Sequence, residues 1–300
     1  MPQSTEPTQS PSQSPSQSQS QSQSHPSPPP DKPDNPNGQV DDAPHPLPTQ
    51  DPYLNLPVIA FGMTGMICLA GESRVVKKPK ESQLPDASQR EYMNDMNRQL
   101  LANEIEAFKR FGRHEGIIEC FQLSQYGIEL ALANGDLEDY INERAEPGNV
   151  VKAAWALSLI EAFAHIHSCR VFVDDIALRN ILVLDGQVKV TDFGQSILLP
   201  LDADITSVTE NDLNIRIEIL HLGWILYSIA SWKVHNYYFS TAEEPDLARP
   251  VSFPNVDDVL CGEIIEKCWR GEYACTEDLR LEAFGLLAGQ KPGVMDEEKE

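Results

Sequence analysis

Lysine and arginine are scarce in this chain of 300 residues, which carries 23 of them against 46 aspartates and glutamates. The formal net charge at pH 7 is -23; residues 1–50 contribute -4 and residues 296–300 contribute -3, which leaves -16 for the remainder. Proteins bind nucleic-acid backbones through clustered basic side chains. The acidic balance therefore predicts that this chain does not bind nucleic acid.

Cysteine pairs with the spacing of zinc or redox motifs are also missing. The six cysteines are scattered between positions 68 and 275 without a C-x-x-C pair, which is typical of free thiols in a reducing compartment. His165, His167 and Cys169 lie close together at the end of a predicted helix. We interpret these three residues as structural and not as metal ligands.

Aromatic residues are absent from residues 1–50, which hold 13 of the 23 prolines and a Ser-Gln repeat. Such a segment cannot bury enough apolar surface to offset its chain entropy, so we predict a disordered tail over residues 1–51. It lacks the apolar core of a signal peptide, and its single basic residue, Lys32, does not fit a transit peptide. The expected location is intracellular, in the cytoplasm or the nucleus.

Residues 52–290 have the composition of a folded domain, and an acidic tail over residues 291–300 follows. Residues 52–71 contain no charged side chain, which raises the alternative of a membrane span. Pro57 and three glycines interrupt this stretch and make a poor spanning helix. We therefore expect two strands joined by a glycine turn, and no membrane contact.

The most informative stretch of the chain lies between residues 171 and 194. Two runs there, Ile181–Leu184 and Gln187–Val190, are rich in β-branched and apolar residues and are separated only by Asp185-Gly186. That dipeptide is typical of a type I′ turn, which requires positive φ at both central positions. The sequence therefore predicts a hairpin in which Ile181 pairs with Val190.

Polar residues lie at the open end of this hairpin. Asn180 immediately precedes the first strand and Asp192 closely follows the second, so the predicted register brings an amide oxygen and a carboxylate together. Hard cations such as Mg²⁺ prefer oxygen ligands of this kind. Asp175 lies one short loop away and is free to accept a proton.

The sequence D-I-A-L-R-N at residues 175–180, followed by D-F-G at residues 192–194, resembles the catalytic loop and metal-binding motif of eukaryotic protein kinases. The chain is similar to small, single-domain kinase-like proteins of fungi. The resemblance implies an α+β, two-lobed protein kinase-like fold. Its small β-rich N-lobe would span residues 52–132 and its larger, mainly helical C-lobe residues 133–290. It also implies ATP and Mg²⁺ as cofactors, with Asp175, Lys77 and Asn180 as catalytic residues and Asn180 and Asp192 as metal ligands.

The resemblance extends to the first half of the domain. Residues 60–65 resemble the glycine-rich loop that covers a nucleotide, and Gly62 and Gly65 occupy its second and third glycine positions. Residues 74–77 resemble the V-A-I-K strand, which implies that Lys77 binds the phosphates; Lys78 is the alternative.

Apolar residues at three- and four-residue steps predict a helix over residues 88–111. The resemblance implies that Glu104 in this helix pairs with the strand lysine, with Glu106 as the alternative. Strand-like runs follow at residues 117–122 and 126–132. Residues 133–137 resemble the linker between the kinase lobes, near which the backbone of Leu130 and Leu132 would meet an adenine edge. Further helices are predicted over residues 151–167, 217–232 and 264–273.

The chain also departs from the kinase pattern. Val173 and Asp174 stand where the family has His and Arg, no A-P-E motif is present, and Glu218 stands where the family has an Asp in its central helix. These departures leave phosphoryl transfer possible but put protein substrates in question. The expected function is an ATP-dependent protein kinase; the alternatives are a pseudokinase that binds nucleotide or acts as a scaffold, and a small-molecule phosphotransferase.

The residues of the catalytic loop also indicate which hydroxyl, of serine/threonine or of tyrosine, would accept the phosphate. Ala177 and Arg179 resemble the tyrosine-specific loop D-L-A-A-R-N, and no Lys stands two residues after Asp175, as it does in serine/threonine kinases. The choice between serine/threonine and tyrosine stays open at this point, as do the protein substrate and the oligomeric state.

Overall fold

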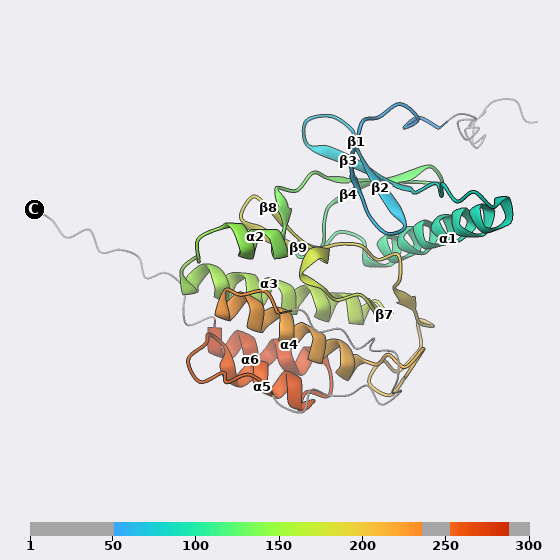
Figure 1. Cartoon of the computed structure of the whole chain (residues 1–300). Helices are drawn as coiled ribbons and strands as arrows, with labels where there is room; N and C mark the ends of the chain where they lie inside the picture. The colour runs from blue at the N-terminus through green and yellow to red at the C-terminus, as the bar shows by residue number, and fades with distance from the viewer. Residues whose placement is uncertain (1–50, 236–252, 288–300) are drawn as a thin grey trace, which may run out of the picture. The chain divides into compact units, whose positions relative to one another are not determined.

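The computed structural model describes residues 51–235 and 253–287 (Figure 1). All of these residues belong to one unit of the chain, Pro48–Glu300. The predicted disordered tail, apart from Asp51, and the predicted acidic tail lie outside the described residues, as do residues 288–290 at the end of the predicted domain.

An antiparallel sheet of five strands forms the N-terminal part, in the order β1-β2-β3-β5-β4. Its strands are β1 (Val58–Phe61), β2 (Gly65–Leu69), β3 (Arg74–Pro79), β4 (Cys120–Ser124) and β5 (Gly127–Ala131). The uncharged stretch that raised the membrane alternative contributes β1 and β2. Among the described residues, no helix is both long and apolar enough to cross a membrane.

Helix α1 (Ala87–Phe111) packs against β3 and β4 of this sheet (Figure 1). The side chain of Asp86 caps its start by accepting a hydrogen bond from the backbone of Gln89 at 2.8 Å. The helix ends at Gly112, whose φ of 61° favours glycine and whose N–H donates to the carbonyl of Phe108. The helix predicted over residues 88–111 is therefore present, with an extra residue at its start.

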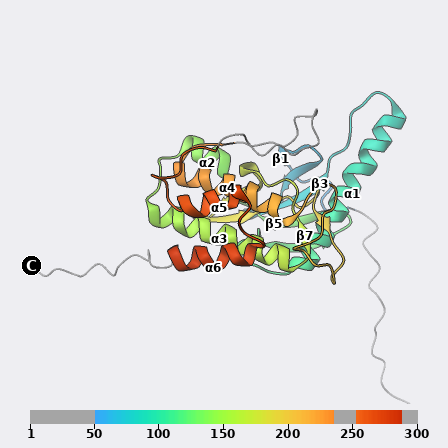
Figure 2. The same cartoon turned by 90° about the horizontal axis from the view of Figure 1, so that it is seen from below.

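The C-terminal part is mainly helical. Its helices are α2 (Leu137–Glu143), α3 (Asn149–Ser168), α4 (Ile215–Ser231), α5 (Gly262–Arg270) and α6 (Thr276–Leu287). Helices α4 and α6 both pack against α3, and α5 packs against α4 (Figure 2). Leu159 and Phe163 of α3 and Ile219 and Leu222 of α4 are all buried in the common hydrophobic core, which agrees with sequences that are apolar on nearly every face.

Short strands of the C-terminal part lie under the N-terminal sheet. Their bounds are β6 (Gly135–Asp136), β7 (Val171–Phe172), β8 (Ile181–Leu184), β9 (Gln187–Val190) and β10 (Ile197–Leu198). The β8–β9 hairpin has the predicted register, with Ile181 opposite Val190. Asp185 and Gly186 both have positive φ, as a type I′ turn requires.

The predicted strand over residues 117–122 is partly wrong. Strand β4 begins only at Cys120, and the N–H of Ile118 donates to the carbonyl of Val190 at 3.0 Å. Ile117 forms a parallel bridge with the same residue, and both isoleucines are buried. This apolar pair therefore joins the hairpin of the C-terminal part and does not extend the sheet. An apolar run alone does not indicate which of these two neighbours it pairs with.

A glycine in α4 sets how closely α5 approaches. A Cβ on Gly223 would lie 2.8 Å from Cβ of Cys268 and 3.1 Å from Cδ1 of Trp269, whereas a Cβ on Gly285 in α6 would meet nothing within 4 Å. We expect Gly223→Ala to lower the free energy of unfolding by about 1–3 kcal/mol through overpacking. Gly285→Ala should instead raise it by up to about 1 kcal/mol, because alanine favours the helix. Urea denaturation of both variants measures this, and equal effects would contradict the close α4–α5 contact.

Candidate active site

A cleft of about 520 Å³ is lined by residues of the sheet and of the C-terminal part. Its lining comes from the β1–β2 turn, β3, the end of β5 and the two segments that flank the β8–β9 hairpin. Every residue that was the first choice for a catalytic, nucleotide-binding or metal-binding role lines this cleft except Glu104. These residues are Gly62, Gly65, Lys77, Leu130, Leu132, Asp175, Asn180 and Asp192.

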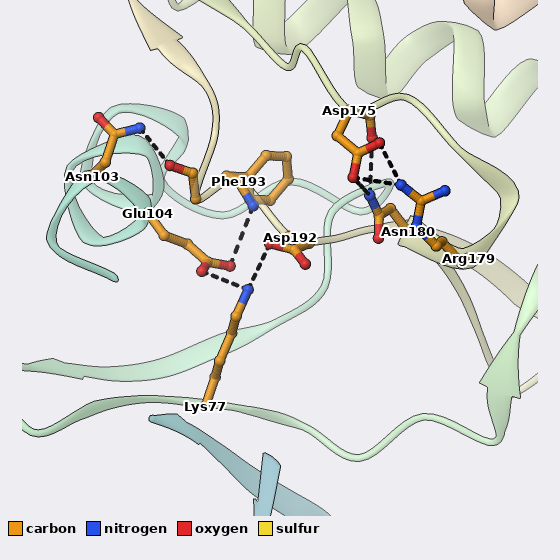
Figure 3. Close-up of polar contacts among 9 residues, drawn as sticks. Lys77, Asn103, Glu104, Asp175, Arg179, Asn180, Asp192 and Phe193 are labelled. Atoms are coloured by element: carbon orange, nitrogen blue, oxygen red, sulfur yellow. Dashed lines mark hydrogen bonds and ion pairs between the residues drawn. The ribbon is translucent and has the colours of Figure 1, made fainter. Parts of the chain in front are cut away.

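Lys77 in β3 is the centre of the polar contacts (Figure 3). Its Nζ lies 2.7 Å from Oε2 of Glu104 on α1 and 2.7 Å from Oδ1 of Asp192, which follows β9. The side chain of Lys77 is 12% exposed and that of Glu104 is 1% exposed. Three elements that are distant in sequence therefore meet at one buried ammonium group.

The charges around Lys77 determine its protonation. Burial acts to lower the pKa of Lys77, but the carboxylates of Glu104 and Asp192 outweigh burial and hold this pKa above its ordinary value. Burial raises the pKa of Glu104, and Lys77 offsets part of that rise. Glu104 and Asp192 therefore stabilise the charged form of the lysine.

The neighbouring alternatives have other partners. Nζ of Lys78 lies 2.6 Å from Oδ2 of Asp51 and donates to the carbonyl of Tyr53, so this lysine anchors the chain that enters β1. Glu106 is exposed and pairs with Lys109 on the surface of α1. Lys77, and not Lys78, therefore lines the cleft, and Glu104, and not Glu106, pairs with it.

Phe193 fixes α1 to the segment that follows β9. Its N–H donates to Oε1 of Glu104 at 3.3 Å, and its buried ring meets Phe108 and Phe111 edge-on, with ring centroids 5.3 and 4.7 Å apart. Asp192 has a positive φ of 62°. The backbone turns there, so that Phe193 enters the core while Asp192 lines the cleft.

Asn180 lies beside Asp192, as the hairpin register predicts. The N–H of Thr191 donates to the carbonyl of Asn180 at 3.0 Å. The Asn180 amide nitrogen donates to the carbonyl and to Oδ2 of Asp175, both at 2.9 Å. This fixes the amide with its oxygen on the side away from Asp175 (Figure 3).

Asp175 has a second partner, to which the sequence assigned no role. The guanidinium of Arg179 donates to Oδ1 and Oδ2 of Asp175, at 2.6 and 2.8 Å. Both side chains are partly exposed and both residues line the cleft. The four-residue spacing was the available signal for this pair, but it predicts contact only once the loop is known to turn in this way.

Glu218 on α4 supports the loop that carries Asp175; in the sequence it stands out only as a departure from the kinase pattern. Its Oε1 accepts hydrogen bonds from the N–H groups of Val173 and Asp174, at 2.5 and 3.3 Å, and its Oε2 lies 2.6 Å from Nε2 of His167. Asp174 adopts a positive φ of 64°. Burial, followed by the charges of Glu218 and Asp175, raises the pKa of Asp174.

The oxygens at the hairpin end fit a magnesium ion. Asn180 contributes an amide oxygen, and Asp192 contributes a carboxylate of which only Oδ1 is bound to Lys77. Mg²⁺ is commonly held by one or two such protein oxygens together with phosphate and water.

The histidines near Cys169 have other partners: His167 contacts Thr276 and Glu218, and His165 contacts the carbonyl of Phe111.

The β1–β2 turn is narrow at the cleft. The N–H of Gly62 donates to the carbonyl of Gly65 at 2.8 Å. A Cβ on Gly65 would lie 3.3 Å from Cε of Lys77 and 3.3 Å from the carbonyl oxygen of Lys78. Glycine at position 65 therefore lets the turn approach the lysine closely.

Comparison with known proteins identifies the same region. Residues 71–212 match the family model of the protein kinase domain. Over 102 residues, the chain is 29% identical to the serine/threonine-protein kinase ksg1 of Schizosaccharomyces pombe. That alignment covers 32% of this chain and 17% of the relative, so this chain aligns with only a small part of that protein. The two-lobed kinase fold implied by the sequence resemblance is confirmed.

The buried carboxylate of Glu218 gives a stability prediction. Glu218→Ala leaves two backbone N–H groups and His167 without their acceptor, so we expect a loss of about 2–4 kcal/mol in the free energy of unfolding. The matched control is Glu266→Ala, which removes only a surface pair with Arg270 and should cost less than about 0.5 kcal/mol. Urea denaturation compares them, and a loss in Glu218→Ala no larger than in the control would refute the supporting role.

Proposed function

Because this chain contains a protein kinase domain, we propose that it is an active protein kinase that binds ATP with Mg²⁺ and transfers the γ-phosphate to a protein hydroxyl. The observation that carries the proposal is that Lys77, Asp175, Asn180 and Asp192 all line one cleft, with Glu104 behind Lys77. Each has the chemistry that its proposed role needs. The cleft volume of about 520 Å³ suits a nucleotide-sized ligand.

Apolar residues of the cleft lining are proposed to receive the adenine. They include Val75, Leu130, Leu132 and Leu182, and the backbone that follows β5 offers polar groups for the base edge. The turn with Gly62 and Gly65 would cover the phosphates. Lys77 would neutralise the α- and β-phosphates, since its ammonium group is charged and pre-positioned.

Asn180 and Asp192 are the proposed ligands of Mg²⁺. When bound, this ion neutralises charge on the phosphate oxygens and favours transfer. The amide of Asn180 is already oriented by Asp175, and Asp192 by Lys77. These two residues therefore need little rearrangement to hold the ion.

Asp175 is the proposed acceptor of the hydroxyl proton. Although Arg179 contacts both oxygens of Asp175, an ionised carboxylate has about four lone-pair sites and can accept further hydrogen bonds. The pair is partly exposed, and such pairs contribute at most about 1 kcal/mol, so its pairing with Asp175 does not prevent Arg179 from contacting an incoming phosphate. Arg179 would then stabilise the transferred phosphoryl group.

A second candidate function is a pseudokinase that binds nucleotide or acts as a scaffold. Asp174 in place of the family's Arg and the missing A-P-E motif favour this alternative. The short interval between Asp192 and Glu218 favours a third, a small-molecule phosphotransferase without a peptide groove. Incubation of the full chain with γ-labelled MgATP, a protein array and a metabolite pool tests all three: label on protein supports the proposal, label on a metabolite supports the transferase, and binding without transfer supports the pseudokinase.

The acceptor hydroxyl is a finer part of the proposal. The relative ksg1 is named a serine/threonine kinase, whereas Arg179 in this chain resembles the tyrosine-specific loop. Phosphoamino-acid analysis of the labelled protein distinguishes the two directly.

Two adjacent lysines provide a sharp test of nucleotide binding. We expect Lys77→Met to abolish most of the rise in melting temperature that millimolar MgATP gives the wild type, because it removes the cation from the cleft. Lys78→Met should retain that rise, because Lys78 pairs with Asp51 away from the cleft lining. No MgATP-dependent rise in the wild type would exclude the nucleotide site, and equal loss in both variants would refute the role of Lys77.

The proton acceptor can be tested in the same chain. Asp175→Asn should lower kcat by about two to four orders of magnitude while it leaves the MgATP affinity nearly unchanged, because Asp175 is a proposed base and not a metal ligand. The control is Asp185→Asn, at an exposed turn where Asn-Gly is equally favourable. Steady-state kinetics should show wild-type rates for the control. Wild-type turnover in Asp175→Asn would reject the assignment.

A further inference from the structure

Asn103, the residue before Glu104 on α1, contacts the segment that follows Asp192. Its side-chain nitrogen donates to the carbonyl of Gly194 at 3.0 Å and to the carbonyl of Ser196 at 2.7 Å. Figure 3 shows Asn103 directed at this segment from the same helix turn as Glu104. Both hydrogens of the amide are thus used on main-chain oxygens.

Other residues of α1 hold the same segment. Glu104 accepts the N–H of Phe193, and Arg110 donates to the carbonyls of Leu199 and Arg170 at 2.6 and 3.3 Å. Strand β10 within the segment pairs with β7. One face of α1 therefore binds main-chain groups at intervals from residue 193 to residue 199.

The segment contains no basic side chain of its own that could bind an added phosphate. Residues 192–214 contain no lysine or arginine, and Asp174 places a carboxylate beside the loop. Ser196 is only 5% exposed, and its hydroxyl has no hydrogen-bond partner in the part of the chain that the structure describes. The hydroxyls of Thr206 and Ser207 both donate to the carboxylate of Asp204, so a phosphate on either would lie beside that negative charge, although Arg170 is also within electrostatic range of Asp204.

We infer that Asn103 is a positioning residue that holds residues 193–199 in the form that directs Asp192 into the cleft, and that it does so in the unphosphorylated chain. The inference rests on the proposed function for its consequence, since an oriented Asp192 matters only if the cleft binds a metal–nucleotide complex. The two hydrogen bonds of Asn103 join an uncharged amide to main-chain oxygens, so they form without a phosphate on the segment.

Hydrogen exchange of the full chain without nucleotide tests the clamp. The N–H of Ser196 donates to Phe193 and that of Leu199 donates to Arg170, so both amides report on the segment. We expect Asn103→Leu to speed their exchange by about tenfold or more, the factor that follows from the loss of two hydrogen bonds. Asn97→Leu is the matched control: Asn97 lies on the same helix but donates to the carbonyl of Lys80.

Each result decides the inference. Faster exchange in Asn103→Leu and not in Asn97→Leu supports it, whereas unchanged or equally changed exchange overturns it. If Asn103→Leu does not fold, Asn103→Asp has the same shape, lacks the donor and should behave in the same way. Phosphatase treatment of the wild type should leave both exchange rates unchanged, and a rise would overturn the inference.

A second measurement separates positioning from stability. The Mg²⁺ concentration that gives half of the nucleotide-induced rise in melting temperature should increase at least fivefold in Asn103→Leu and stay unchanged in Asn97→Leu. An unchanged Mg²⁺ requirement in Asn103→Leu would overturn the positioning role even if exchange is faster. If the wild type shows no nucleotide-induced rise at all, the proposed function fails, and the exchange experiment still decides whether Asn103 clamps the segment.

Discussion

The buried ammonium group of Lys77 is the constraint on which the rest of the site depends. An unpaired charge at this depth would cost several kcal/mol, so Lys77 is tolerated only while Glu104 and Asp192 remain in contact with it. Its partners come from α1 and from the segment after β9, elements that are also joined by apolar packing around Phe193 and by the hydrogen bonds of Asn103. Displacement of either element leaves a charge without a partner, and for that reason the arrangement tends to form as a whole.

A second buried charge supports the opposite side of the cleft. Glu218 accepts hydrogen bonds from the backbone N–H groups of Val173 and Asp174, and in this way it holds the loop that carries Asp175. Every residue except proline has such an N–H group. These two contacts do not depend on the side chains of Val173 and Asp174. His167 connects the same carboxylate to Thr276 on α6, which ties the loop to the helical core.

Local patterns predicted much of the fold and less of the site. Asp185-Gly186 determined the hairpin register, because only one turn type accommodates two residues with positive φ. The sequence could not separate Lys77 from Lys78, since the choice depends on which face of β3 meets the cleft. The contacts of Asn103 span more than 90 residues to a main-chain oxygen, and no side-chain pattern records such an acceptor. Ile117 and Ile118 were predicted to begin the strand that in fact starts at Cys120, because apolarity does not specify which neighbour a residue joins.

The ion-paired side chains of the cleft have a net negative charge. Lys77 faces two carboxylates and Arg179 faces one, so these five side chains carry one more negative than positive charge. Asp136 at the rim adds another carboxylate. A bare polyphosphate would enter against this excess, whereas a polyphosphate already joined to a divalent cation would bring part of the compensating charge with it. Under the proposed function, the cleft thus discriminates by ionic form as well as by shape, and free nucleotide competes poorly with its metal complex.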